Sequence, residues 1–116
     1  GETSAGRAAN LTLLCPENAL AISPAAGRVA YAGELKLTGN TVVIDHGCGV
    51  KSYLFGLESI SGIATGDEVT AGQGLGIAGR KLIWEVRIGN KSVDPQKLTR
   101  GGSDGLFYRP VGDELR

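Results

Sequence analysis

In the first half of the stretch "GRKLIWEVRIGNKSVDP", residues 79–95, side chains typical of a protein core alternate with side chains that are mostly charged. One face of an extended chain would carry Leu82, Trp84 and Val86, and the other Lys81, Ile83, Glu85 and Arg87. A period of two over residues 81–87 predicts a β-strand with one buried face, and Asp94-Pro95 predicts the exit from it. Trp84 therefore belongs to the predicted core.

The rest of the chain repeats this pattern in shorter pieces. Glycine is unusually frequent, with 19 of 116 residues, and it is spread among Val, Ile, Leu and Thr. Turns are predicted at Pro24–Gly27, Cys48-Gly49, Gly66-Asp67 and Ala71-Gly72, so residues 40–57 form a hairpin. No helical period persists, and residues 94–100 make one helical turn at most. We therefore predict an all-β domain, a sandwich or barrel of many short antiparallel strands.

Charge excludes two classes of partner. Twelve Lys and Arg balance twelve Asp and Glu, and no block of one sign occurs. A nucleic-acid-binding protein or a membrane-surface protein normally carries a basic patch. We expect no nucleic acid as a partner and no membrane contact by this domain itself, since no apolar run approaches the roughly 20 residues of a membrane span.

The chain divides into three segments. Residues 1–17 are expected to be a flexible or partly ordered N-terminal segment, 18–98 the domain, and 99–116 a C-terminal extension. An apolar knot at Leu106-Phe107-Tyr108 should pack this extension back on the domain. The polar start leads us to expect a leader or an anchor ahead of Gly1.

Two cysteines, Cys15 and Cys48, are too far apart in sequence for a metal-binding pair. Two separate thiols are favoured, and one disulfide in an exported protein is the alternative. The single histidine, His46, is interpreted as a structural residue hydrogen-bonded near a turn, because one histidine builds no zinc site.

Four blocks follow one another along the chain: "SPAAGRVAYAG", "GNTVVIDHGCGVKSY", "GDEVTAGQGLGIAG" and "LIWEVRIGNKSVDP". Together they resemble the LytM-type (lysostaphin-like) zinc endopeptidase domain of cell-wall proteins, over roughly residues 18–98. The resemblance implies a duplicated hybrid motif with a glycine-rich β-fold. It also implies an ancestral activity, the cutting of peptide cross-bridges in peptidoglycan.

The zinc and catalytic positions of that family are not filled. The family's His-x-x-x-Asp motif has no counterpart in "LTLLCPENALAI", and its Tyr-x-His-Leu motif falls at "SYLFGL", with Phe55 or Gly56 in the histidine place. Its last motif, His-Leu-His-Phe-Glu-Val-Arg, aligns to residues 81–87, so Lys81 and Ile83 replace both histidines. An isoleucine cannot ligate zinc and a lysine ammonium repels it. The resemblance therefore implies no cofactor and no hydrolysis.

What remains is a binding module. The resemblance to metal-free members implies an extracytoplasmic domain, in the periplasm or at the cell surface, that docks a cell-wall hydrolase or an envelope-complex protein. The candidate docking cleft consists of Lys81, Ile83, Glu85, Tyr53 and Phe55. Glu85 and Arg87 pairing across strands is the structural alternative. Two other functions stay open: an endopeptidase with relocated ligands, and a module that binds peptidoglycan directly.

Overall fold

The computed structural model describes residues 10–89, 91–93 and 108–109, and these residues form nine strands and no helix. The strands are β1 (Asn10–Leu14), β2 (Leu20–Ile22), β3 (Gly27–Leu35), β4 (Gly39–Gly47), β5 (Val50–Ile60), β6 (Glu68–Val69), β7 (Gly74–Ile88), β8 (Lys91–Val93) and β9 (Tyr108–Arg109). The prediction of an all-β fold with many antiparallel strands is confirmed. None of the described residues forms a helix with the length and hydropathy that a membrane crossing needs.

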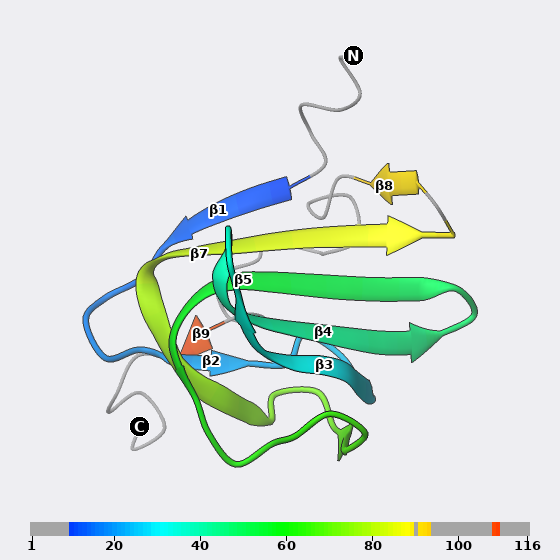
Figure 1. Ribbon diagram of the computed structural model, residues 1–116, viewed down its shortest axis with the longest axis horizontal. Helices are drawn as coiled ribbons and strands as arrows, with labels where there is room; N and C mark the ends of the chain where they lie inside the picture. Colours follow the sequence, from blue (N-terminus) through cyan, green and yellow to red (C-terminus); the bar gives the residue numbers. More distant parts are fainter. Residues whose placement is uncertain (1–9, 90, 94–107, 110–116) are drawn as a thin grey trace.

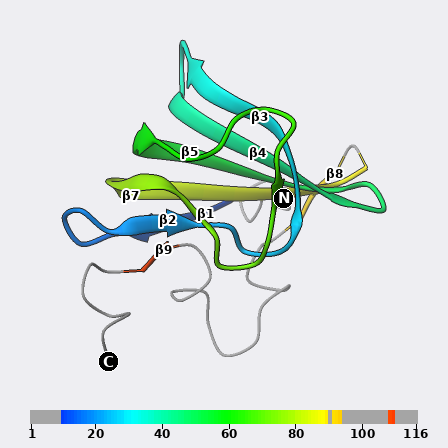
Figure 2. The same ribbon diagram turned by 90° about the horizontal axis from the view of Figure 1, so that it is seen from below.

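All pairings are antiparallel, and β7 is the strand on which the sheet is built (Figure 1). The strand order is β6-β3-β4-β5-β7-β2-β9, and β1 and β8 also pair with β7. The C-terminal half of β7 lies between β5 and β1, whereas its N-terminal half lies between β5 and β2. Figure 2 shows the same order from below, with the β3–β4 hairpin rising away from β2.

A pair of glycines lets β7 bend between these two halves. Phe55 lies opposite Ile83 and Leu57 opposite Ala78, so several residues of β7 face the single residue Gly56. Gly56 has a φ of 87°, and a Cβ on it would meet the backbone carbonyl of Lys81. A Cβ on Gly79 would lie 2.5 Å from the carbonyl oxygen of Gly56. Only glycine permits this close approach, which makes β5 and β7 longer and more bent than the short strands predicted.

The hairpin between β4 and β5 is the one that the sequence predicts. Its two turn residues, Cys48 and Gly49, have φ values of 55° and 79°. Positive φ at both central residues is the feature of a type I′ turn, which matches the twist of the flanking strands. The turns at Gly66 and Gly72 also have the positive φ expected of them, 99° and 83°.

The core lies on the inner face of the curled sheet. Leu82, Trp84 and Val86 are at most 4% exposed, which confirms the inward face predicted for residues 81–87. Directly opposite residues of antiparallel strands share a face, so the same side carries Leu54 and Leu13. The further core side chains are Cys15, Ala19, Ala21, Val29, Val42, Ile44, Leu57, Val69, Leu75 and Ala78.

The two ends of the chain both contribute a strand. β1 adds residues 10–14 to the edge of β7, and β9 pairs Tyr108 and Arg109 with Ala21 and Leu20 of β2. Residues 1–9, the predicted helical turn at 94–100, and Leu106 and Phe107 of the apolar knot lie outside the described residues. Cys15 is buried, Cys48 is exposed, and both are free thiols, as favoured from the sequence.

Candidate functional site

The side of the sheet opposite the core carries all five residues of the predicted docking cleft. We call this side of β1, β5 and β7 the outer face; it consists of Thr12, Leu14, Tyr53, Phe55, Lys81, Ile83, Glu85 and Arg87. Register explains why they meet: Tyr53 lies opposite Glu85, and Phe55 lies opposite Ile83. Lys81 lies two residues further along β7, on the same side.

The register also decides between Phe55 and Gly56 as the residue that faces the cleft. Phe55 pairs with Ile83 and is half-buried on the outer face. Gly56 sits against the backbone of β7, where no side chain would fit. Phe55 is therefore the side chain beside Ile83, and it is one of the two positions that the resemblance offers for a histidine.

The two aromatic rings of β5 form a platform at the centre of the outer face. Tyr53 and Phe55 are stacked, with ring centroids 6.3 Å apart and planes 29° apart. Both are half-buried, so each side chain remains partly exposed to solvent. Offset stacked rings of this kind present a flat apolar surface, which suits another apolar side chain or the face of a sugar.

Arg87 lies beside Tyr53 at one end of the aromatic platform. Its Nε donates to Glu85 Oε2 over 2.7 Å, and its guanidinium lies 4.5 Å from the centroid of the Tyr53 ring. The hydrogen bond to Glu85 raises the pKa of Arg87, and the charges of Glu85 and Tyr53 act in the same direction against desolvation. The ion pair expected across strands thus runs along β7 instead, because residues two apart on one strand share a face.

Two residues of the outer face were not predicted from the sequence. Thr12 lies opposite Ile83, and Leu14 lies opposite Lys81. Leu14 is 73% exposed, an unusual state for a strand leucine. The sequence "LTLL" does not predict which strand it pairs with. Only the long-range register therefore places Thr12 and Leu14 at the site.

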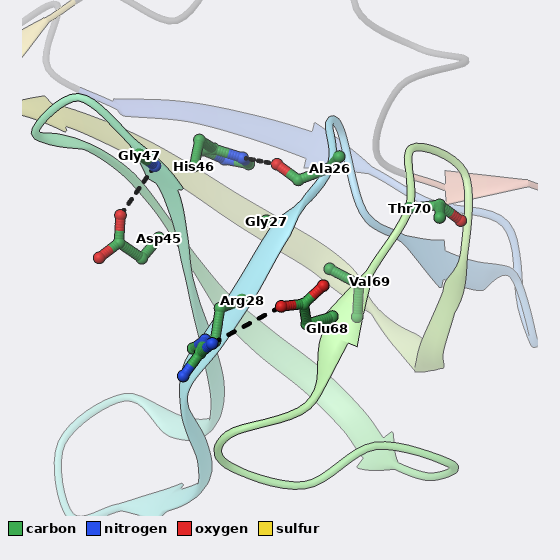
Figure 3. Close-up of a pocket in the computed structure, with 9 residues that line it drawn as sticks. All are labelled: Ala26, Gly27, Arg28, Asp45, His46, Gly47, Glu68, Val69 and Thr70. Carbon is green, nitrogen blue, oxygen red and sulfur yellow. Dashed lines mark hydrogen bonds and ion pairs between the residues drawn. The ribbon is translucent and has the colours of Figure 1, made fainter.

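His46 has the structural role that the sequence predicts. Its Nδ1 lies 2.8 Å from the carbonyl oxygen of Ala26, which can only accept, so Nδ1 carries the proton (Figure 3). Its Nε2 lies 2.8 Å from Ser52 Oγ. The same Oγ accepts a hydrogen bond from Trp84 Nε1 over 3.0 Å. In the neutral tautomer Ser52 donates to Nε2, and the bonds tie the Pro24–Gly27 turn to the core.

A hollow of about 530 Å³ opens beside His46, away from the predicted cleft. Figure 3 shows Arg28 and Glu68 forming an ion pair at 3.6 Å on one side of it and Asp45 accepting from the Gly47 amide on another. Its lining consists of Ala26, Gly27, Arg28, Asp45, His46, Gly47, Glu68, Val69 and Thr70. Most of its polar groups are paired with one another, and Arg28 and Glu68 are largely exposed.

The outer face does not fit a zinc ion. Zinc takes its ligands from cysteine, histidine, aspartate and glutamate. Within the described part of the chain, no three such side chains come close enough to hold a metal. The residues around Ile83 are Phe55 and Thr12, of which neither is a zinc ligand of the family, and Glu85 is engaged by Arg87. No hydrolytic step through a metal follows from this arrangement.

Comparison with known proteins agrees with the fold described above. The sequence matches peptidase family M23 over residues 8–95, which is most of the chain. The chain belongs to this family. The LytM-type resemblance is thereby confirmed, and the match begins before residue 18, so it takes in β1. A search of curated protein sequences found no match.

Solved structures share the M23 fold. A putative peptidase M23 from Pseudomonas aeruginosa is 31% identical with a TM-score of 0.69, and the alignment covers 78% of this chain and 42% of that one. Csd3 from Helicobacter pylori has a TM-score of 0.75 at 19% identity, covering 92% and 29% of the two chains. A chain in the complex of SpoIIIAH and SpoIIQ has a TM-score of 0.60 at 22% identity, covering 64% and 57%. The present chain thus spans less than half of the Csd3 and Pseudomonas chains.

Proposed function

We propose that this M23 domain is a non-catalytic binding or regulatory module in cell-envelope (peptidoglycan) remodelling, and that a partner protein docks on its outer face. One observation carries the proposal. At the positions where the family resemblance calls for zinc-binding and catalytic histidines, the outer face presents Ile83, Lys81 and Phe55. These side chains offer an apolar and cationic surface in place of metal ligands.

The partner is a cell-wall hydrolase or an envelope-complex protein outside the cytoplasm, in the periplasm or at the cell surface. Support comes from a chain of this fold that occurs in a complex of two proteins, SpoIIIAH and SpoIIQ. Binding a regulatory segment of the partner on the outer face would favour the partner conformation in which that segment is released. The stacked Tyr53 and Phe55 rings and the Arg87–Glu85 pair would supply contact area and orientation.

The first test separates this proposal from an endopeptidase with relocated ligands. The purified protein is analysed for bound zinc by mass spectrometry and incubated with purified peptidoglycan, alone and with added zinc. We expect zinc far below one equivalent and no release of soluble fragments. Stoichiometric zinc together with hydrolysis would refute the non-catalytic assignment.

The second test addresses the docking surface. The domain is added to each purified cell-wall hydrolase of its source organism, and the release of peptidoglycan fragments is followed. We expect one hydrolase to be stimulated by the unaltered domain and not by folded Ile83→Asp or Lys81→Glu variants. Stimulation by both variants at the unaltered level would show that the partner docks elsewhere.

Direct binding of peptidoglycan is the second candidate function, and the open aromatic platform of Tyr53 and Phe55 favours it. Sedimentation of the domain with purified peptidoglycan, with no other protein present, tests this candidate. Retention that is lost on Tyr53→Ala would support it, whereas an unbound domain would leave the protein partner as the ligand.

A further inference from the structure

One end of the outer face exposes a leucine directly beside a lysine. Leu14 of β1 lies opposite Lys81 of β7, and its side chain is 73% exposed. Ile83 and Phe55 continue this surface toward the centre of the face, each half-buried. An exposed leucine on a paired strand adds little to the core, and a contiguous apolar patch bounded by charge is typical of a protein interaction site.

Two hydrogen bonds between β1 and β7 fix this end of the outer face. The Cys15 amide donates to the Arg80 carbonyl over 2.9 Å, and Arg80 Nε donates to the Cys15 carbonyl over 3.1 Å. These two bonds follow directly after the Leu14–Lys81 pair. A surface fixed before binding loses little conformational entropy when a partner arrives, which favours affinity.

At the opposite end of the outer side each cation has a carboxylate as a neighbour in the register or along its own strand. Asp45 lies opposite both Arg28 and Lys51, and Arg87 is bonded to Glu85. Lys81 differs, because its neighbour across the strand pair is Leu14, and none of the described carboxylates forms an ion pair with it. The unmatched positive charge therefore lies at the Leu14 end.

We infer that the occupant of the outer face is a protein segment that packs an apolar side chain against Leu14, Ile83 and Phe55 and places a carboxylate at Lys81 Nζ. The inference rests on the proposed docking function and adds the chemistry and the direction of the bound segment. At about 3.3 Å per residue, the strand from Lys81 to Arg87 is about 20 Å long, which suits about six extended residues of the occupant. The carboxylate belongs at the Lys81 end, because Arg87, the other cation of the outer face, is already bonded to Glu85, whereas Lys81 has no ion pair among the described residues.

A library of random peptides displayed on phage provides the test. The library is selected on the whole chain, and recovered peptides are synthesised and titrated against the unaltered protein and three variants. We expect peptides that combine an apolar residue with Asp or Glu. Their affinity should fall about ten-fold in Lys81→Glu and about ten-fold in Leu14→Ser. In the matched control Lys51→Glu it should change less than about two-fold, because Lys51 faces Asp45.

All three substituted side chains are exposed, so circular dichroism should show unchanged folding. Peptides that bind the outer face without acidic residues, or equal losses in Lys81→Glu and Lys51→Glu, would overturn the inference and leave the docking function standing. If no recovered peptide depends on Leu14 or Lys81 and the domain sediments with peptidoglycan instead, both the inference and the docking function are wrong.

Discussion

The two faces of β7 alternate residue by residue, yet they depend on different neighbours. Leu82, Trp84 and Val86 point inward and are almost completely buried among side chains of β1 and β5. Ile83 and Glu85 point outward and are only partly buried, with the Glu85 side chain 14% exposed. The inward face holds the sheet together, whereas the outward face can change its chemistry at little cost in stability. The fold of this M23 domain therefore depends on the inward residues of β7 more than on the residues of its outer face.

The largest expected effect comes from breaking the inward face. Trp84→Ala should lower the free energy of unfolding by about 3–5 kcal/mol, because it leaves a large cavity and removes the hydrogen bond to Ser52. Ile83→Ala, on the outward face of the same strand, should cost less than half of that. Urea denaturation followed by circular dichroism measures both. Equal losses would mean that the two faces are equally buried.

The bend of β7 depends on a glycine on its neighbour. Gly56→Ala should cost about 2–4 kcal/mol, because a Cβ at a φ of 87° is strained and also meets the Lys81 backbone. Gly62→Ala is the matched control: its φ is 79°, but no atom lies within 4 Å of the added Cβ. The control should lose only about 1 kcal/mol in the same urea experiment. A similar loss in both variants would show that the close approach contributes nothing.

Ser52 joins the inward face to His46. Ser52→Ala should cost about 1–3 kcal/mol, since its buried hydroxyl serves both His46 Nε2 and Trp84 Nε1. Ser59→Ala on the same strand, where the side chain is exposed, should be nearly neutral. Thermal unfolding compares the two. If Ser52→Ala were as stable as the unaltered protein, the hydrogen bonds would have no net value.

The smallest effect is expected from the ion pair on the outer face. Arg87→Met should lower stability by less than about 1 kcal/mol, because solvent screens an arginine that is 44% exposed. Because the hydrogen bond to Glu85 raises the pKa of Arg87, its contribution is fully present at neutral pH and is lost only in strong alkali. Arg28→Met, which breaks a longer and more exposed pair, should cost even less. A loss of Arg87 stabilisation that high salt does not reduce would contradict this account.

Patterns of neighbouring residues correctly predicted the features of the fold that depend only on neighbouring residues. The alternation at residues 81–87 gave the two faces of β7, and Cys48-Gly49 gave the hairpin of β4 and β5. Both follow from the chain's own geometry, so neighbouring residues suffice. Strand parity also places Lys81, Ile83 and Glu85 on one face of β7, but Tyr53 and Phe55 join them only through the register of β5 against β7.

What the sequence left open depends on pairing between distant segments. "NLTLL" alternates weakly, so its register against β7 and the exposure of Leu14 follow only once the strands are paired. The approach of Gly56 and Gly79 likewise requires both strands in place. The direction of the Arg87–Glu85 pair is set by a rotamer choice beside Tyr53, which no sequence pattern encodes.

The position of β1 also has a consequence for how the chain folds. Residues 10–14 leave the ribosome early, but their partners are residues 81–85, so the pairing must wait until most of the domain has been made. Until then an apolar strand without a charged residue stays unpaired, and such segments aggregate or bind chaperones. Completion of the outer face is therefore a late step in folding, and an unfinished chain does not yet have Leu14 beside Lys81.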